Sequence, residues 1–289
     1  MKTHYVDIDG LRIGDGYPVR TMGVINLSPE SFYKGAVAVG KENIEQAVDA
    51  MESEGAEIID IGGASTAPKS VYKRQEVTVR EEIRRVGTAM KVITDRSNIP
   101  VSIDTVWSNV AEVALDLGAV LINDTSGLKA DSNMVKLASS RDCSIILMAN
   151  CCNPCQSVEE SLEAIRTSLS VADESGVRNE RIIVDPGIGF GKPPEIDCTI
   201  LRELNRFIEL NYPVLVGVSR KAFIGSILEQ PNPSERLVGS LAATALAVFQ
   251  GANIIRTHDA RETKMAIKIG ESIKGKGVAN QKMNASDDQ

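Results

Sequence analysis

Eight short apolar runs recur along this chain from residue 19 onward, and longer segments separate each run from the next. The runs cover residues 22–26, 58–61, 101–104, 120–124, 145–148, 182–185, 214–218 and 254–258. Between them, segments such as 42–54, 109–117 and 238–249 carry apolar residues at three- and four-residue steps, as amphipathic helices do. Strands that alternate with helices eight times favour a closed parallel barrel. The sequence therefore predicts an α/β fold, a (β/α)8 barrel, with residues 1–289 forming a single domain.

The two ends of the chain differ from this pattern. Two short alternating runs lie within residues 1–18 and are joined by Asp9-Gly10, which predicts an N-terminal β-hairpin that covers one end of the barrel. The last stretch is rich in glycine, lysine and asparagine, and we expect residues 275–289 to form a frayed tail.

Charge and apolar content exclude several classes of partner. The chain has 32 basic and 39 acidic residues, a net charge of −7, which disfavours non-specific binding to nucleic acid or to an anionic membrane. No apolar run approaches the roughly 18 residues of a membrane span, and the N-terminus lacks the apolar core of a signal peptide. We expect a cytoplasmic protein with small-molecule partners.

Polar residues stand at, or just beyond, the ends of the predicted strands. A single such residue is often only a helix cap or a turn former. Eight of them at successive strand ends indicate the catalytic face of a barrel, because that face is built from the loops that follow the strands. They are Asn26, Thr66, Asp104, Asn123, Asn150, Asp185, Lys221 and His258.

The most informative loop follows the sixth run. There an apolar, β-branched strand ends in Asp185, and three glycines within residues 187–191 let the backbone approach a ligand closely. A turn with no ligand is the alternative for this loop alone. It is not a nucleotide-binding fingerprint, because the glycine spacing differs and Lys192 is followed by Pro193.

Seven ordered blocks carry a resemblance to a known family. They are residues 22–32 (MGVINLSPESF), 62–66 (GGAST), 102–105 (SIDT), 122–124 (IND), 185–192 (DPGIGFGK), 217–221 (GVSRK) and 256–259 (RTHD). Together they closely resemble dihydropteroate synthases, which are pterin-binding enzymes, and an archaeal-type variant is one alternative. The resemblance implies a transferase of folate or methanopterin-type biosynthesis that joins 6-hydroxymethyl-7,8-dihydropterin pyrophosphate to an arylamine and releases pyrophosphate.

The resemblance also implies roles for individual residues. Asp104, Lys221 and Asp185 would be catalytic, with Asp104 stabilising a dihydropterin cation electrostatically. One buried carboxylate, Asp185, can accept from both the ring N–H and the exocyclic amine of a pterin. The implied pterin contacts are Asn123, Met148, Asp185, Phe190, Gly217, Lys221 and Arg256; the pyrophosphate contacts are Ser28, Thr66 and His258; the arylamine contacts are Pro68, Ser219 and Arg220. Asn26 would help to hold Mg²⁺, and we expect a homodimer.

Three departures from the family pattern concern both substrates. Alanines stand at positions 64 and 67, where glutamate and a pyrophosphate-binding arginine are usual. Tyr33-Lys34 replaces a short polar pair in the first loop, and Ala222 replaces a serine that helps to bind p-aminobenzoate. The lost charge at 67 is replaceable by Lys34, Lys69 or Lys73. Either the natural amine carries a ribosyl group instead of a bare carboxylate, or the changes are neutral drift.

Three hypotheses remain open beside this one. Cys151, Cys152 and Cys155 have a spacing that suits a metal, or they are incidental thiols. A methyltransferase domain that passes a methyl group from a pterin to a corrinoid protein shares the barrel and the carboxylates, but it lacks the Ser219-Arg220-Lys221 triplet. A non-catalytic pterin-binding relative would keep the pocket and lose the leaving-group chemistry.

Overall fold

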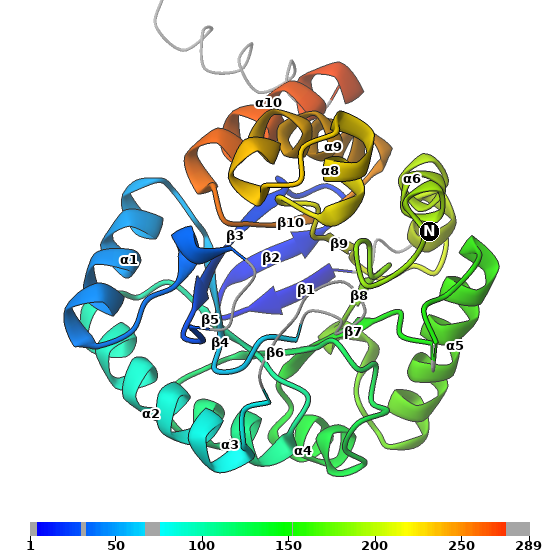
Figure 1. The fold of residues 1–289 in the computed structure, drawn as a ribbon. Helices are drawn as coiled ribbons and strands as arrows, with labels where there is room; N and C mark the ends of the chain where they lie inside the picture. Colours follow the sequence, from blue (N-terminus) through cyan, green and yellow to red (C-terminus); the bar gives the residue numbers. More distant parts are fainter. Residues whose placement is uncertain (1–4, 30–32, 67–75, 152, 276–289) are drawn as a thin grey trace, which may run out of the picture.

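The computed structural model describes residues 5–29, 33–66, 76–151 and 153–275, and it contains the predicted barrel (Figure 1). The parallel strands are β3 (Arg20–Asn26), β4 (Ile58–Gly62), β5 (Val101–Asp104), β6 (Leu121–Asp124), β7 (Ser144–Met148), β8 (Ile182–Asp185), β9 (Leu215–Val216) and β10 (Ile254–Thr257). The helices are α1 (Lys41–Ser53), α2 (Val79–Arg96), α3 (Ser108–Asp116), α4 (Asn133–Arg141), α5 (Val158–Glu174), α6 (Pro194–Arg202), α7 (Asn205–Ile208), α8 (Ala222–Leu228), α9 (Leu237–Gln250) and α10 (Ala260–Lys274).

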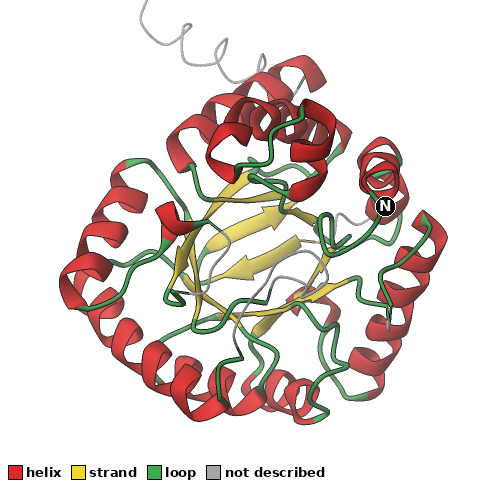
Figure 2. Ribbon diagram, in the orientation of Figure 1, coloured by secondary structure: helices red, strands yellow, loops and turns green. Residues whose placement is uncertain are grey.

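The strands close on themselves and the helices surround them, as Figure 2 shows. The sheet order is β8-β7-β6-β5-β4-β3-β10-β9, with every neighbouring pair parallel. Closure comes from a parallel bridge between Val184 and Val214, where the Val184 amide donates to the Pro213 carbonyl at 2.9 Å. The prediction of a (β/α)8 barrel is confirmed.

The N-terminal hairpin closes the end of the barrel at which the parallel strands begin, opposite their carboxyl ends. Strands β1 (Tyr5–Ile8) and β2 (Leu11–Gly14) pair antiparallel, and Val6, Ile8 and Ile13 are fully buried. They pack against one apolar layer of the barrel interior, formed by Met22, Ile58, Leu121, Ile146, Ile183, Leu215 and Ile254. Because this end is filled with side chains, a ligand has access only from the carboxyl ends of the strands.

Two further expectations concern membrane-spanning helices and the C-terminal tail. Among the residues that the structure describes, no helix combines the length and apolar content needed to cross a bilayer. The tail expected at 275–289 lies, except for Gly275, outside the described residues. The proposal of one domain over residues 1–289 stays a prediction.

Candidate active site

A polar layer lies directly above the apolar layer of the barrel. Side chains alternate along a strand, so a residue two positions after an interior residue also points inward. Two positions beyond the apolar layer stand Asp60, Asn123, Met148, Asp185, Gly217 and Arg256. Asp104 joins them because it pairs in register with Asn123. The strands thus bring most of the predicted pterin residues to one depth.

Arg256 holds two buried carboxylates together at the centre of this layer. Its Nε donates to Asp60 Oδ2 at 2.6 Å and its Nη2 donates to Asp104 Oδ2 at 2.8 Å. Asn123 Nδ2 also donates to Asp60 Oδ2, at 3.1 Å. Burial and the Asp60 carboxylate raise the pKa of Asp104 to about 7, against the attraction of Arg256. A fixed cation between two carboxylates offsets their mutual repulsion and part of the free-energy cost of burying them inside the barrel.

Three acceptor atoms of this network have no partner. Within the described part of the chain, Asp60 Oδ1, Asp104 Oδ1 and Asn123 Oδ1 are buried and accept no hydrogen bond. Buried acceptors are nearly always satisfied in folded proteins, and leaving one unsatisfied costs about 1–3 kcal/mol. The arrangement therefore suits a ligand that presents several N–H or O–H donors to the strand ends.

The glycine loop after β8 is held from behind by two buried ions. Gly187, Gly189 and Gly191 all have positive φ, which favours glycine. Lys192 Nζ donates to the Gly187 carbonyl at 2.6 Å, and Asp197 Oδ1 accepts from the Gly189 amide at 2.9 Å. A Cβ at 189 would lie 2.6 Å from Lys221 Cδ. The glycines thus allow the loop to pack directly against Lys221.

Asp185 and Lys221 face the site from the two sides of this loop. Asp185 Oδ1 accepts from the Gly187 amide at 2.7 Å, while burial raises the pKa of Asp185 above its usual range. The Lys221 ammonium lies 4.0 Å from the centroid of the Phe190 ring. Burial and the neighbouring Arg256 lower the pKa of Lys221 to about 8, so this lysine can lose its proton near neutral pH.

His258 and Ser219 form a second group beside the polar layer. Ser219 Oγ lies 2.9 Å from His258 Nδ1 and accepts from the His258 backbone amide at 3.2 Å. Since that amide already donates to Oγ, the simplest assignment is that the serine O–H donates to Nδ1, which puts the ring proton on Nε2. Burial and the cations Arg256, Lys221 and Arg220 lower the pKa of His258 to about 3, so the ring is neutral.

Arg220 is tied to the protein by four hydrogen bonds. Its Nε and Nη2 donate to the two carboxylate oxygens of Asp259, at 2.9 and 2.6 Å, and Nη1 donates to the carbonyls of Pro233 and Ser234. Its backbone adopts a left-handed φ of 57°, and the Arg220 amide donates to Ser240 Oγ at 2.8 Å. This residue is predicted to contact the arylamine, but most of its donors serve the fold.

Asn26, Ser28 and Thr66 lie at the same end of the barrel. Asn26 ends β3 and is half-buried, Ser28 is buried, and Thr66 Oγ1 donates to Asp104 Oδ2 at 3.3 Å. Pro68, Lys69 and Lys73 lie outside the described residues. The described residues contain no group of three histidine, cysteine, aspartate or glutamate side chains arranged for a metal ion.

The metal hypothesis for the cysteines does not fit the structure. Cys151 and Cys155 form a disulfide, so neither supplies a thiolate ligand. Cys152 lies outside the described residues. The expectation of incidental free thiols is also wrong for this pair, because the two sulfur atoms are bonded to each other. Residue spacing alone does not reveal that the loop after β7 brings them together.

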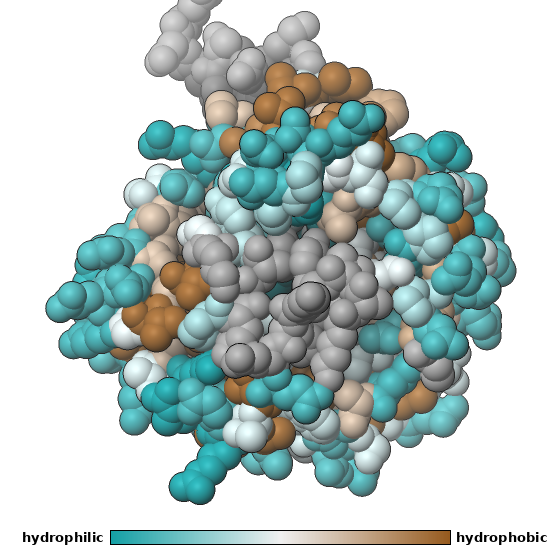
Figure 3. Space-filling model, in the orientation of Figure 1, coloured by the Kyte–Doolittle hydropathy of each residue, from teal (hydrophilic) through white to brown (hydrophobic). Residues whose placement is uncertain are grey.

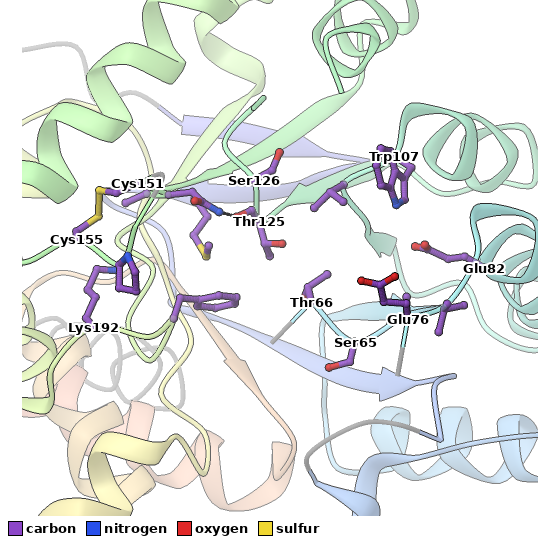
Figure 4. A pocket seen from close by; sticks show the side chains of 18 residues that line it. Ser65, Thr66, Glu76, Glu82, Trp107, Thr125, Ser126, Cys151, Cys155 and Lys192 are labelled. Carbon is purple, nitrogen blue, oxygen red and sulfur yellow. Dashed lines mark hydrogen bonds between the residues drawn. A yellow bond between two sulfur atoms is a disulfide. The ribbon is translucent and has the colours of Figure 1, made fainter. Parts of the chain in front are cut away.

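A cavity of about 560 Å³ opens over the carboxyl ends of the strands (Figure 4). Thr66, Met148 and Phe190 line it, together with the disulfide at one end and Trp107 at the other. Glu82 of α2 also lines it; this buried carboxylate accepts from Thr105 Oγ1 at 2.7 Å, and burial raises its pKa. Glu82 and Asp60 are candidate site residues that the sequence prediction missed.

Fold and site together define a barrel enzyme with an acceptor-rich ligand site at its open mouth. Comparison with known proteins makes the class more specific. A family model described as pterin binding enzyme matches residues 22–258. The chain belongs to the pterin-binding enzyme family.

Several of its relatives within that family are named dihydropteroate synthases. A dihydropteroate synthase of Clostridium beijerinckii is 38% identical over 87% of this chain and 93% of its own length, and one of Bacillus subtilis is 36% identical over 89% of each. A solved dihydropteroate synthase of Clostridium difficile, obtained in the presence of pteroic acid, has a TM-score of 0.81 and 37% identity and covers 89% of this chain and 97% of its own. The resemblance inferred from the seven blocks is confirmed.

The first prediction concerns pH. We expect a bell-shaped dependence of kcat/KM, because Asp104 would have to be ionised to stabilise a cation and Lys221 protonated to donate a charge-assisted hydrogen bond. With pKa values of about 7 for Asp104 and about 8 for Lys221, activity falls as the pH drops through 7 and as it rises through 8. Lys221→Arg should extend the alkaline limb, since a guanidinium stays protonated. An unchanged alkaline limb in that variant would contradict the assignment.

The second prediction concerns Asp185. Asp185→Asn should weaken binding of a pterin by about 1–3 kcal/mol, because an amide N–H would face the N–H edge of the ring and leave buried donors unpaired. Calorimetry with a pterin that lacks the pyrophosphate measures this directly. The matched control is Asp173→Asn, at an exposed position of α5, which should bind as the unmodified protein does. Equal affinity in both variants would remove Asp185 from the site.

Proposed function

We propose that this chain joins the methylene carbon of 6-hydroxymethyl-7,8-dihydropterin pyrophosphate to the amino nitrogen of an arylamine, with release of pyrophosphate. The observation that carries the proposal is the set of unsatisfied acceptors of Asp60, Asp104 and Asn123 beside Asp185, at the mouth of a barrel. The N–H groups of a pterin match such a set. Named dihydropteroate synthases cover most of this chain, and a solved one was obtained in the presence of pteroic acid.

The charges of the polar layer support a cationic intermediate. Asp60, Asp104 and Asp185 supply three carboxylates, and Arg256 and Lys221 supply two cations, so the ionised layer is negative by one charge. When the carbon–oxygen bond breaks before the amine attacks, the dihydropterin methylene becomes positive. A buried site with one excess negative charge stabilises that cation without forming a covalent bond to it.

Within this proposal Lys221 donates to the pterin carbonyl and ring nitrogen. Arg256 stacks on the face of the pterin ring next to Gly217. A Cβ at 217 would lie 3.7 Å from Arg256 Cβ, so glycine keeps this side of the pocket open for a flat ring. Met148 and Phe190 supply apolar walls, and Phe190 keeps the Lys221 ammonium close by. Ser28, Thr66 and His258 would hold the pyrophosphate.

We further propose that Mg²⁺ assists the departure of pyrophosphate. Asn26 offers one amide oxygen near the site, and Mg²⁺ commonly takes few protein ligands and completes its shell with water and substrate phosphates. The described residues hold no three His, Cys, Asp or Glu side chains arranged for a metal ion, which agrees with an ion that takes few protein ligands. When bound, the ion would neutralise charge on the leaving group.

The rival functions find less support. Two relatives that match 87% and 89% of this chain are named dihydropteroate synthases, and the chain carries the Ser219-Arg220-Lys221 triplet that corrinoid-dependent methyltransferases are expected to lack. We propose a cytoplasmic location in folate or methanopterin-type biosynthesis.

Quaternary structure is proposed from the surface. Large apolar side chains are exposed along α8, α9 and α10, and Figure 3 shows them as a brown area over these helices. They are Ile227, Leu228, Val238, Leu246, Phe249, Met265, Ile269 and Ile273, with exposed fractions of 45–77%. An apolar surface of this kind marks an association site, and we propose that a second copy of the chain covers it.

The third prediction tests the amine. Ala222 removes a hydroxyl where the family binds a carboxylate, so p-aminobenzoate should bind less well by roughly 1.5–3 kcal/mol than to a site with a serine. We expect an aminobenzene riboside phosphate to give a higher kcat/KM than p-aminobenzoate, and Ala222→Ser to narrow the difference. Steady-state rates with both amines, dihydropterin pyrophosphate and excess Mg²⁺ measure this. A preference for p-aminobenzoate in the unmodified protein would mean that the departures are drift, and no turnover with either amine would overturn the synthase assignment.

The fourth prediction tests the dimer. Leu246→Glu on α9 should convert the dimer to monomers, because a carboxylate in the centre of an apolar contact is desolvated without a partner. Sedimentation velocity reports the mass of both proteins. The control is Val171→Glu, at an exposed position of α5. A monomeric unmodified protein would contradict the proposal.

A further inference from the structure

Glu82 is a buried carboxylate to which the proposed reaction assigns no role. It lies in the first turn of α2, is 2% exposed, and lines the cavity over the strand ends (Figure 4). The Thr105 hydroxyl donates to Glu82 Oε1 at 2.7 Å, and among the described contacts this is the one hydrogen bond of the carboxylate. An amide would accept the same hydrogen bond without the cost of burying a charge. The charge therefore has a reason other than folding.

Glu82 connects α2 to the ends of two barrel strands. Thr105 directly follows Asp104, the last residue of β5, and the Thr105 amide donates to the Asn123 carbonyl at 3.3 Å. Gly63 directly follows β4, and a Cβ at this position would lie 2.8 Å from Glu82 Cγ. A glycine is thus required here for α2 to approach the end of β4 so closely.

The two segments that Glu82 contacts meet again at the site. The segment that begins with Gly63 continues to Thr66, whose Oγ1 donates to Asp104 Oδ2 at 3.3 Å. Arg85 of α2 strengthens the same connection, because its Nη1 donates to the Gly63 carbonyl at 3.0 Å. The geometry of the Thr66–Asp104 pair therefore depends on two strand ends that α2 holds through Glu82.

The charge of Glu82 also acts on Asp104. Burial raises the pKa of Asp104 to about 7, and the carboxylates of Asp60 and Glu82 act in the same direction. Fixed negative charge at this place stabilises a cation that forms nearby, without a bond to it. The groups that oppose the shift are Arg256 and the Thr66 hydroxyl, and Lys221 is the further cation with which Asp104 interacts.

We propose that Glu82 is a positioning residue of the candidate active site, which orients the Thr66–Asp104 pair through Thr105 and Gly63 and adds a fixed negative charge beside it. This inference rests on the proposed function for the identity of the cation, which is the dihydropterin methylene. Glu82 acts through Asp104 and forms no bond to the substrate. The buried charge lowers the stability of the fold and favours the reaction.

Glu82→Gln removes the charge and keeps an acceptor for the Thr105 hydroxyl. The kcat should fall roughly threefold to thirtyfold, less than the roughly hundredfold loss typical of a group that contacts the reacting atoms. Calorimetry with a pterin that lacks the pyrophosphate should show a change of less than about twofold in affinity. The melting temperature should stay the same or rise, because a buried charge is removed. A residue with a purely structural role would lower the melting temperature instead.

The pH dependence distinguishes the charge from the contact. Without the Glu82 carboxylate the pKa of Asp104 falls, so the acid limb of kcat/KM should move to lower pH in Glu82→Gln. The alkaline limb, assigned to Lys221, should stay. The control is Asp95→Asn, which removes a negative charge from an exposed position of the same helix and should leave both limbs unchanged.

A measurement of Asp104 that does not need turnover accompanies the kinetics. In protein labelled with ¹³C at the aspartate carboxyl groups, the Asp104 resonance is identified by its absence in Asp104→Asn. Its titration midpoint should lie at lower pH in Glu82→Gln than in the unmodified protein, and Asp95→Asn should not move it.

Thr105→Val tests the contact and keeps the Glu82 charge. It removes the hydroxyl that donates to Glu82, so kcat should fall while the affinity for the bare pterin stays within about twofold. Thr105→Ser keeps the hydroxyl, which also accepts from the Trp107 amide at 3.3 Å, and should behave as the unmodified protein does.

The outcomes separate this proposal from the proposed reaction. An unchanged Asp104 midpoint in Glu82→Gln, or an unchanged kcat in that variant, would overturn the role of Glu82. If Glu82→Gln does not fold, equal kcat values for Thr105→Val and Thr105→Ser would overturn it. Failure of every amine to give product would overturn the proposed reaction, while the titration of Asp104 would still decide whether Glu82 acts on it.

Discussion

The ion pairs of Arg256 with Asp60 and Asp104 are the interaction on which the rest of the site depends. Two carboxylates on neighbouring strands repel each other in a barrel that excludes water, and taking an ion out of water costs several kcal/mol. Arg256, from β10 on the other side of β3, reaches both at 2.6 and 2.8 Å. Its guanidinium offers donors in two directions, which the ammonium of a lysine does not do with fixed geometry. The polar layer is stable because one planar cation spans it.

The hydrophobic interior is the counterpart of this charge network. The hairpin and one residue from each of seven barrel strands fill the hairpin end of the barrel with apolar side chains. The charged layer is therefore open to water only toward the carboxyl ends of the strands. The same pleat that buries Ile58, Leu121 and Ile254 directs Asp60, Asn123 and Arg256 inward two positions later. Core and site are consecutive layers of one strand pattern, and this is why a chain with an ordinary composition can hold so many polar groups inside a barrel.

The sequence predicts this pattern well where residue type and position agree. The strands could be predicted because each is a short apolar run between helical segments, and Asp104, Asn123 and Asp185 could be found because they lie at or next to the ends of such runs. Asp60 was missed because it lies within an apolar run, at Ile59-Asp60-Ile61, although a carboxylate inside a buried strand is itself a signal of an interior partner. Glu82 lies within a helix pattern, where nothing in the spacing distinguishes a buried carboxylate from an exposed one. The disulfide and the contacts of Arg220 depend on loop conformation, which local sequence does not determine.

The departures from the family pattern matter most at the anion subsite, which is the proposed pyrophosphate site at Ser28, Thr66 and His258. Position 67 lacks the usual arginine, and three of the described cations near the site are already paired: Arg256 with Asp60 and Asp104, Arg220 with Asp259, and Lys192 with the Gly187 carbonyl. His258 is neutral, so it contributes direction and no charge. A subsite with few uncommitted cations has to bind a polyanion through well-oriented donors and through whatever ion accompanies the substrate. In such a subsite the orientation of each donor matters more than it would beside a free arginine, and the Tyr33 ring, where the family has a short polar pair, contacts both Arg220 and His258.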